Sequence, residues 1–313
     1  MENLDTEETS YQQPPVLPKP ILEQDKKNWI RRSLVSLGIY AFLFYVIFDQ
    51  TLIYIAALLL VVMIHESGHF IAMKFFKYND VKLFIIPLLS AYVSGKKSTI
   101  SQRQRIIIIL AGPVPGIIIG SCLLISTVYY PSERIEMLGN IFFFLNWFNL
   151  LPIIPLDGGR LLETLFIHQN HVIRLVFTII SIICLSVLAI LFKNPILLII
   201  PLSMVFDLLM EIKNHKIREY LKQENINYIT DYKDLPDRDY WSIRDCILLS
   251  FGKRYTGVQA GVQQYSLLEG GLIQHVISVL KIPFIKDVKI FGKIIVTLIY
   301  IFFLIILPFY IFS

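Results

Sequence analysis

Long apolar segments alternate with short polar segments along most of the chain. Several of the apolar segments approach the roughly 20 residues that an α-helix needs to cross a lipid bilayer. They cover residues 33–48, 52–76, 105–128, 138–156, 172–192, 195–210 and 290–312. We therefore predict an all-α polytopic membrane protein with about six to seven transmembrane helices.

The stretch 77–104 interrupts this pattern directly after the second apolar run. It contains the segment 81–93, which is rich in residues that favour β-strands. We expect a short β-hairpin-like segment here. The hairpin can either pack on the preceding helix or offer a strand edge to an extended peptide, and Pro87 limits which part can pair.

The composition supports a lipid environment. Hydrophobic residues make up 55% of the chain and charged residues only 17%, against about 45–50% and 25% in ordinary soluble domains. A disordered chain and a soluble enzyme are therefore excluded. The three cysteines lie far apart, which argues against a disulfide framework or a cysteine zinc site. The net charge of +5 comes without a basic stripe, so we expect no nucleic-acid partner.

The distribution of Lys and Arg predicts the orientation. When the runs are threaded with the N-terminus in the cytoplasm, all but two of the 29 Lys and Arg residues lie inside. The two outside are Arg134 and Lys193. We expect an integral multi-pass protein of a bacterial cytoplasmic membrane, given its compact design and a tail without a targeting signal.

With this orientation the chain divides into four parts. Residues 1–30 are polar and proline-bearing and are expected to form a disordered cytoplasmic tail. Residues 31–210 form the transmembrane core, and residues 289–313 form a C-terminal transmembrane helix. Residues 211–288 form a cytoplasmic module of unknown role, whose composition fits a gate, a recruiting surface or a spacer.

The second run contains the polar group His65-Glu66-Ser67-Gly68-His69. Positions i and i+4 share one face of a helix, so both imidazoles can bind the same metal ion. Glu66 beside them can accept a proton from a water on that ion. Such residues are unfavourable inside lipid, and packing alone does not require this spacing. We therefore predict a metal site about 20 Å into a hydrocarbon core about 30 Å thick, entered from the cytoplasmic side.

A catalytic zinc ion takes three protein ligands and keeps one position open for water. Asp157 is the best candidate for the third ligand, because the predicted topology places it at about the depth of His65. The prolines and glycines around it favour irregular backbone, which membranes tolerate only inside protein or along a cavity. Taken alone, this Asp would instead be read as the cap of a helix that starts near Arg160.

These motifs resemble those of the site-2 protease family of intramembrane zinc metalloproteases. The resemblance covers about residues 50–165. It rests on the His-Glu-Ser-Gly-His motif, on Asn149-x-x-Pro-x-x-Pro-Leu-Asp157-Gly, and on the Leu-Ala-Gly-Pro element at 110–113. The stretch 77–104 is too short for the PDZ domain that some members insert there, so the chain resembles a compact member.

The resemblance implies one Zn²⁺ per chain, bound by His65, His69 and Asp157. It implies that Glu66 is the general base, and that Asn149 holds the substrate or polarises the scissile carbonyl. Asn146 is the second choice for that role, because it lacks the eight-residue step to Asp157. The implied activity is that of a metalloendopeptidase, which cleaves a transmembrane protein within or near its membrane-spanning segment.

Two other functions are compatible with the sequence. The first is a different membrane zincin with a Glu as the third ligand. Glu163 lies close to Asp157 in the chain, whereas Glu136 falls in the predicted outer loop, on the wrong side of the membrane. The second is a zinc-binding membrane scaffold or adaptor that does not cleave. The intact Glu66 argues against it, since a site that only binds metal needs no base.

Overall fold

The computed structural model describes residues 16–21, 31, 35, 38, 39, 51–86, 90–167 and 170–312. Most of the predicted run 33–48 therefore lies outside the described residues. The chain divides into two compact units. We call Gln24–Ile212 with Ile282–Ser313 the membrane unit, and Met1–Glu23 with Lys213–Lys281 the module.

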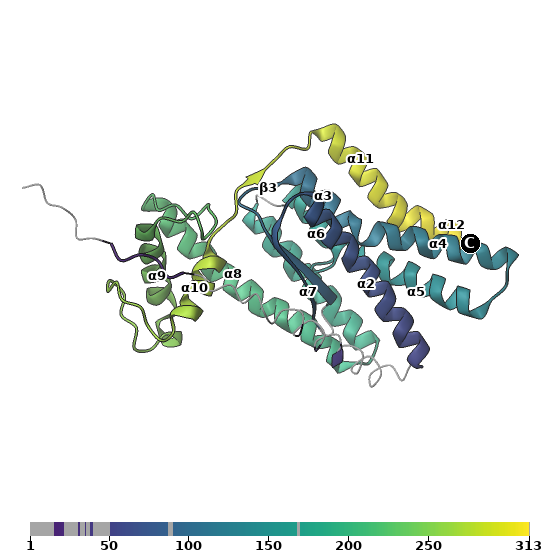
Figure 1. Ribbon diagram of the computed structural model, residues 1–313, viewed down its shortest axis with the longest axis horizontal. Coiled ribbons are helices and arrows are strands. Elements are labelled where there is room, and N and C mark those ends of the chain that lie inside the picture. The colour runs from purple at the N-terminus through teal and green to yellow at the C-terminus, as the bar shows by residue number, and fades with distance from the viewer. Residues whose placement is uncertain are drawn as a thin grey trace, which may run out of the picture. The chain divides into compact units, whose positions relative to one another are not determined.

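Helices build most of the membrane unit (Figure 1). Short π-helical turns at Glu163–Ile167 and Phe302–Ile306 and a 3₁₀ turn at Pro195–Leu198 extend three of them. The α-helices are α2 (Leu52–Phe75), α3 (Gln102–Ala111), α4 (Pro113–Tyr129), α5 (Glu133–Asn149), α6 (Asp157–Leu162), α7 (His171–Leu191), α8 (Ile199–Gln223), α11 (Ile290–Ile301) and α12 (Leu307–Phe312).

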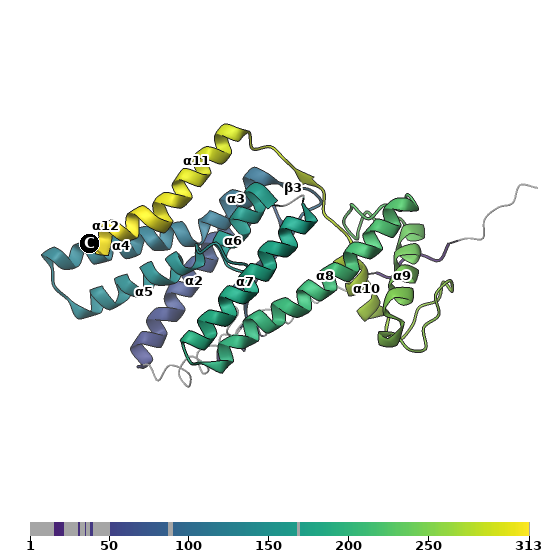
Figure 2. The same cartoon turned by 180° about the vertical axis from the view of Figure 1, so that it is seen from behind.

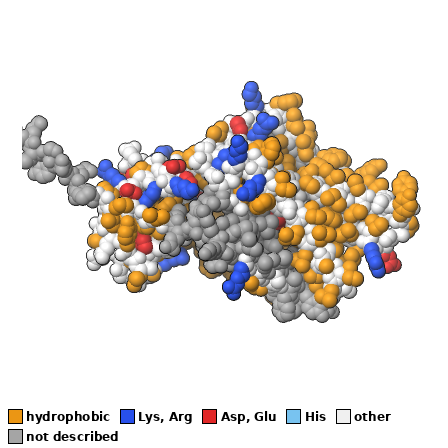
Figure 3. All heavy atoms as spheres, viewed as in Figure 1, with side chains coloured by type: hydrophobic (Ala, Val, Ile, Leu, Met, Phe, Trp, Pro, Cys, Tyr) orange, Lys and Arg blue, Asp and Glu red, His pale blue; other side chains and the backbone are white. Residues whose placement is uncertain are grey.

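Five of these helical stretches are long and apolar enough to cross a membrane. They cover Leu52–Phe75, Gln102–Tyr129, His171–Leu191, Pro195–Gln223 and Ile290–Phe312. In the last of them only 6% of the most apolar window is buried inside the protein. Hydrophobic side chains also cover much of the visible surface of this unit (Figure 3). Exposing so much apolar helix surface to water would be unfavourable, so the chain is an integral membrane protein.

The predicted run 138–156 differs from the observed structure. Helix α5 starts earlier, at Glu133, and ends at Asn149, and residues 150–156 form a loop. Glu136, which the sequence pattern places in an outer loop, lies in the first turn of α5 together with Glu133. Acidic side chains are favourable there because the N-terminal end of a helix carries partial positive charge.

Two small sheets lie in the membrane unit. Strand β1 (Asn79–Ile86) pairs with β2 (Ser90–Lys96) in antiparallel orientation, where the sequence predicts a hairpin-like segment. Strand β3 (Ile100–Ser101) pairs in parallel with β4 (Phe284–Ile285). The second pairing fixes the start of α3 beside the segment that leads into α11.

The core of the membrane unit is formed where α2, α4 and α5 meet. Helices α4 and α5 lie side by side in both views (Figures 1 and 2). Val61 of α2 packs in one cluster with Phe142 of α5, and Phe143, on the next position of α5, packs with Ile117 of α4. This arrangement brings the middle of α2 against the C-terminal half of α5.

The module contains the end of α8 and the helices α9 (Asp237–Phe251) and α10 (Glu269–Val279). Helix α10 lies within residues 267–280, where apolar residues recur at helical spacing. Its core includes the fully buried Ile247 and Leu272. Residues 16–21 contact this unit, so the disordered tail expected over 1–30 does not extend to them. Sequence composition missed this contact because its partners lie more than 200 residues away in the chain.

Candidate metal centre

Helix α2 positions two imidazoles side by side. His65 and His69 lie one helical turn apart, and both are buried, with 4% and 8% of their surface exposed. Their ring centroids are 4.9 Å apart, and the two Nε2 atoms are 3.2 Å apart. The two nitrogens therefore point at the same small volume.

Asp157, the first residue of α6, completes the group. Its Oδ2 lies 3.2 Å from the Nε2 of both His65 and His69. The three buried side chains each offer one ligand atom, and these atoms lie within 4.8 Å of one another. Oδ2 is buried without a well-formed hydrogen bond. Its position is explained by a cation between the three atoms better than by a hydrogen bond.

The spacing of the ligand atoms fits zinc. Bonds of about 2.0–2.1 Å in tetrahedral geometry hold two ligand atoms about 3.3 Å apart. The observed separations of 3.2 Å agree with that value. Two imidazoles and one carboxylate are also a donor set of the catalytic zinc class, which leaves a fourth position open.

The remaining imidazole nitrogens have partners that set the tautomer. Nδ1 of His65 is 2.7 Å from Oδ1 of Asn146, and Nδ1 of His69 is 2.7 Å from the carbonyl oxygen of Ile108. Both oxygens only accept hydrogen bonds, so each Nδ1 carries the proton. Each Nε2 therefore keeps a free lone pair for a metal ion.

Asn146 is itself fixed in place. It is fully buried on α5, and its Nδ2 donates to the carbonyl of Phe142 at 2.7 Å. That bond orients the amide so that Oδ1 faces His65. Sequence reasoning ranked Asn146 only as a second choice for holding substrate, and it did not identify the contact with His65. The polar residue inside an apolar helix was the available signal.

Two glycines make room for this arrangement. A Cβ on Gly112, at the junction of α3 and α4, would lie 2.3 Å from Nε2 of His69. A Cβ on Gly116 of α4 would lie 2.1 Å from Nδ2 of Asn146. Any larger residue at either position would displace the imidazole or its partner. The small residues of the 110–116 segment are therefore part of the site.

Glu66 follows His65 on the same helix and is 4% exposed. Its Oε1 lies 4.0 Å from Nε2 of His65. Glu66 thus lies beside the ligand group without belonging to it. A carboxylate at this distance can reach a water in the fourth ligand position.

The loop 150–156, which leads into Asp157, is held from two sides. The hydroxyl of Ser181 on α7 accepts a hydrogen bond from the backbone N–H of Ile154 at 3.0 Å. The hydroxyl of Tyr300 on α11 donates to the carbonyl of Leu150 at 2.7 Å. Neither residue was identified from the sequence. Both belong to long apolar runs, where nothing distinguishes them from ordinary packing residues.

Two of the other candidate residues have polar partners of their own. Asn149 is the last residue of α5, and its Nδ2 donates to the carbonyl of Leu145 at 3.0 Å. Glu163 forms ion pairs with Arg174 at 3.0 Å and Arg105 at 3.5 Å. The carboxylate of Glu163, the alternative third ligand, is therefore engaged by two arginines. Glu136 lies in the first turn of α5.

A known peptidase family matches the part of the chain that contains α2. Residues 53–135 match the model of peptidase family M50. The matched region contains both histidines and Glu66, and it ends before Asp157 and Asn149. The predicted likeness to the site-2 protease family is thereby confirmed, whereas the assignment of Asp157 as a ligand depends on the geometry given above.

Two curated proteins are similar to part of the chain. Stage IV sporulation protein FB of Bacillus subtilis is 31% identical over 114 residues, which cover 36% of this chain and 40% of that protein. A zinc metalloprotease of Methanocaldococcus jannaschii is 32% identical over 111 residues, which cover 33% of this chain and 31% of that protein. The chain thus spans less than half the length of the curated relatives that it matches.

One solved structure is also similar. The site-2 protease from Methanocaldococcus jannaschii aligns with a TM-score of 0.42 and 22% sequence identity. The alignment covers 56% of this chain and 86% of that one.

Proposed function

We propose that this chain is an intramembrane zinc metalloprotease that hydrolyses a peptide bond within or near a transmembrane segment of a membrane-protein substrate. The observation that carries this proposal is the convergence of His65, His69 and Asp157 beside Glu66, all buried, in an apolar membrane unit. The match to peptidase family M50 around the two histidines supports the same reaction class.

One Zn²⁺ per chain would be held by Nε2 of His65, Nε2 of His69 and Oδ2 of Asp157. When bound there, zinc supplies a Lewis acid that polarises a carbonyl and lowers the pKa of a water towards about 7. The three residues cannot bind this ion while their ligand atoms are protonated. The Nδ1 partners described above keep both imidazoles in the required form.

Glu66 acts as the general base in this proposal. It takes a proton from the attacking water while the water oxygen bonds to the scissile carbonyl carbon. The C–N bond then breaks, and Glu66 delivers that proton to the leaving nitrogen. Asn149, at the end of α5, is proposed to hold the substrate or to donate a hydrogen bond to the scissile carbonyl oxygen.

A transmembrane substrate must unwind before cleavage, because a helix hides its peptide bonds in its own hydrogen bonds. The β1–β2 hairpin is a two-stranded sheet whose outer edges can pair with an extended segment. We propose this edge as the place where unwound substrate is held. We also propose that the N-terminus and the entrance to the site face the cytoplasm of a bacterial cell.

The first test compares membrane-protein N-termini in cells that express the wild type or Glu66→Gln. We expect new N-termini inside predicted transmembrane segments, absent from the variant, with zinc still bound at one per chain. If both strains gave the same N-termini under several stress conditions while zinc stayed bound, a non-cleaving scaffold would replace the protease.

A second test concerns the ligand set. Asp157→Ala should lose bound zinc, and the matched variant Glu163→Ala should keep it, because Glu163 is paired with two arginines. Metal content of the purified proteins measures both. The opposite pattern would identify a zincin with a Glu ligand.

A further inference from the structure

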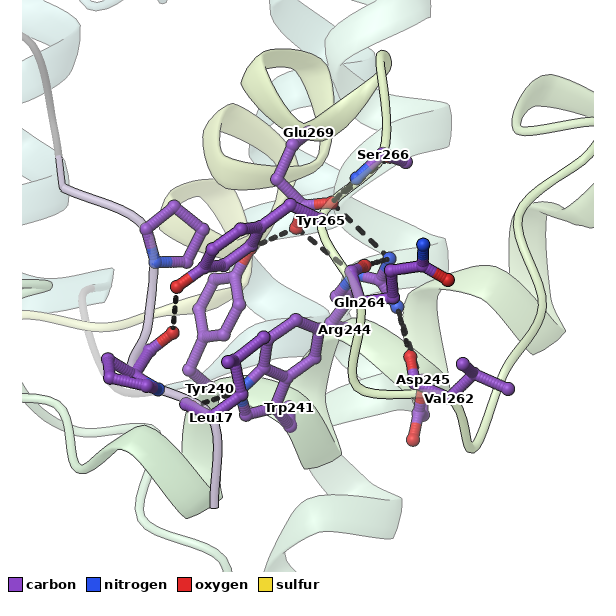
Figure 4. A network of polar contacts seen from close by, with 12 residues as sticks. Leu17, Tyr240, Trp241, Arg244, Asp245, Val262, Gln264, Tyr265, Ser266 and Glu269 are labelled. Atoms are coloured by element: carbon purple, nitrogen blue, oxygen red, sulfur yellow. Dashed lines mark hydrogen bonds and ion pairs between the residues drawn. The ribbon is translucent and has the colours of Figure 1, made fainter. Parts of the chain in front are cut away.

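Residues 16–20, Val-Leu-Pro-Lys-Pro, belong to the module and lie outside any helix or strand. Figure 4 draws Leu17 together with Trp241 and Tyr265 of the module. The partners come from the segment 231–237, from α9 and from the segment 262–265. The contacts are hydrogen bonds to both the backbone and the side chain of this segment.

Within residues 17–20, the module satisfies both backbone N–H groups and three of the four carbonyls. The N–H of Leu17 donates to Oε1 of Gln263 at 3.0 Å, and the N–H of Lys19 donates to Oδ1 of Asp237 at 3.0 Å. The two prolines have no N–H. The module therefore needs no hydrogen-bond acceptor for the backbone nitrogens of Pro18 and Pro20.

Aromatic donors bind the carbonyls of the same segment. Nε1 of Trp241 donates to the carbonyl of Leu17 at 2.6 Å, and the hydroxyl of Tyr265 donates to the carbonyl of Pro18 at 2.6 Å. The hydroxyl of Tyr232 donates to the carbonyl of Pro20 at 2.8 Å. Burial raises the pKa of Tyr232 to about 12, so its hydroxyl keeps the proton at neutral pH. Aromatic donors that read a proline-rich extended chain are a common mode of peptide recognition.

Lys19 adds specificity. Its ammonium donates to the carbonyls of Tyr232, Lys233 and Leu235 at 2.8, 2.8 and 2.5 Å. It also lies 5.4 Å from the centroid of the Tyr232 ring. Three converging carbonyls and an aromatic face select a cation and reject a carboxylate.

A buried ion pair supports the aromatic side of this surface (Figure 4). Arg244 is 1% exposed and donates to Glu269, with Nε 3.1 Å from Oε1, and its guanidinium lies 4.9 Å from the Trp241 ring. Tyr240 donates to the same carboxylate at 2.6 Å. The rings of Trp241 and Tyr265 are stacked with centroids 6.0 Å apart. These interactions join residues of the module to one another and hold the donors Trp241 and Tyr265 in place.

We propose that the module is a peptide-binding domain for an extended Leu-Pro-Lys-Pro sequence, and that its occupant is residues 17–20 of the same chain. The surface binds the backbone of this ligand, accommodates its prolines and binds its one cation, Lys19. Docking holds residues 17–20 against the module, which includes the end of α8. It does so independently of the metal centre.

The direct test uses the full chain lacking residues 1–21, in lipid nanodiscs, and a fluorescent peptide of residues 12–27. We expect saturable binding to the truncated protein and much weaker binding to the intact chain, whose own segment competes. A peptide with Lys19→Glu should bind at least about tenfold more weakly. The matched peptide with Lys27→Glu, which has the same change of charge, should bind like the unaltered one.

Hydrogen exchange of the intact chain gives an answer even if the truncated protein does not fold. The amides of Leu17 and Lys19 should exchange slowly in the wild type and at least about tenfold faster in Lys19→Glu and Trp241→Phe. Lys27→Glu should change neither amide. Fast exchange in the wild type, or equal binding of both altered peptides, would overturn the proposal. Protection that disappears on dilution would overturn the occupant named here and assign the segment to a second copy of the chain.

Discussion

At the residue scale, two asparagines of α5 differ in what they contact. Asn146 is fully buried against His65, whereas the Nδ2 of Asn149 donates to the backbone of its own helix. Asn146 therefore acts as a positioning residue through the imidazole. Binding of the scissile carbonyl oxygen by Asn149 is part of the proposed mechanism.

Substitution of each asparagine by Ala should separate the two roles. Asn146→Ala should weaken zinc binding by about 10–100-fold, because His65 loses the group that fixes its orientation. Asn149→Ala should keep zinc and slow cleavage by about 10²–10³-fold, as loss of a carbonyl-binding donor does. Competition with a chromophoric chelator measures the first, and kcat the second. If Asn149→Ala lost zinc and Asn146→Ala kept it, the assignments would be reversed.

Sequence alone could predict the three candidate ligands, but not the residues that orient them. His65 and His69 follow from the i, i+4 spacing on one helix, and Asp157 follows from the predicted topology and the family motif. The partner of His65 lies 81 residues away on another helix. No local pattern encodes such a contact, because it depends on how α2 and α5 pack.

His275 provides a prediction on pH dependence in the module. Its Nδ1 lies 3.1 Å from the hydroxyl of Tyr255, and its Nε2 is buried without a hydrogen-bond partner. Burial, followed by repulsion from Arg254 and Lys213, lowers the pKa of His275 to about 4. The folded module therefore disfavours the charged ring, whereas the unfolded chain protonates it near pH 6.5.

The stability that His275 contributes is complete above about pH 6.5 and is lost as the pH falls towards 4. The loss amounts to about 3 kcal/mol at about 1.4 kcal/mol per pKa unit. Urea unfolding followed by hydrogen exchange in α10 measures it. Between pH 6.5 and 5, where carboxylates remain charged, His275→Phe should flatten the slope. An unchanged slope would show that another group titrates.

At the element scale, helix α11 stabilises the loop 150–156, which leads into Asp157. Tyr300 on α11 is 6% exposed and donates to the carbonyl of Leu150, which is fully buried. The π-helical turn Phe302–Ile306 follows, and there the carbonyl of Leu304 accepts from Nε1 of Trp147 at 2.9 Å. The α11–α12 segment therefore contacts the start of the 150–156 loop and the end of α5.

Tyr300→Phe should leave the Leu150 carbonyl buried without a partner, which costs about 1–3 kcal/mol. We expect a lower Tm and faster loss of zinc to a chelator, because the loop that carries Asp157 becomes less constrained. Thermal unfolding in detergent and the rate of zinc release measure both. Tyr310→Phe is the matched control, since that side chain is 77% exposed. Equal behaviour of the two variants would contradict this role for α11.

The boundaries of the elements were harder to predict than their existence. The apolar run 138–156 gives no sign that its helix ends at Asn149, because Leu150 and Leu151 continue the hydrophobic pattern. Pro152 and Pro155 were visible in the sequence. Where the chain leaves the helix, however, depends on the bonds of the loop with Ser181 and Tyr300.

At the scale of the whole molecule, the proposed docking of residues 17–20 constrains the topology. A segment and the module that binds it in the same chain must lie on one side of the membrane. The chain between Ile21 and Lys213 must then cross the membrane an even number of times. The sequence predicts six crossings in this interval, of which the first, 33–48, lies largely outside the described residues.

This argument predicts the accessibility of three positions. Epitope tags are placed after Met1, in the exposed loop at Gly257–Gly261, and after Ser313. In right-side-out vesicles the first two tags should resist added protease, because both lie in the cytoplasm with the excess of Lys and Arg. The third should be cleaved, since 290–312 adds a seventh crossing. Lys19→Glu should leave this pattern unchanged, because the spans and their flanking charges fix the topology before any peptide docks. A first and second tag on opposite faces would contradict docking within one chain, while leaving the metal centre and its chemistry untouched.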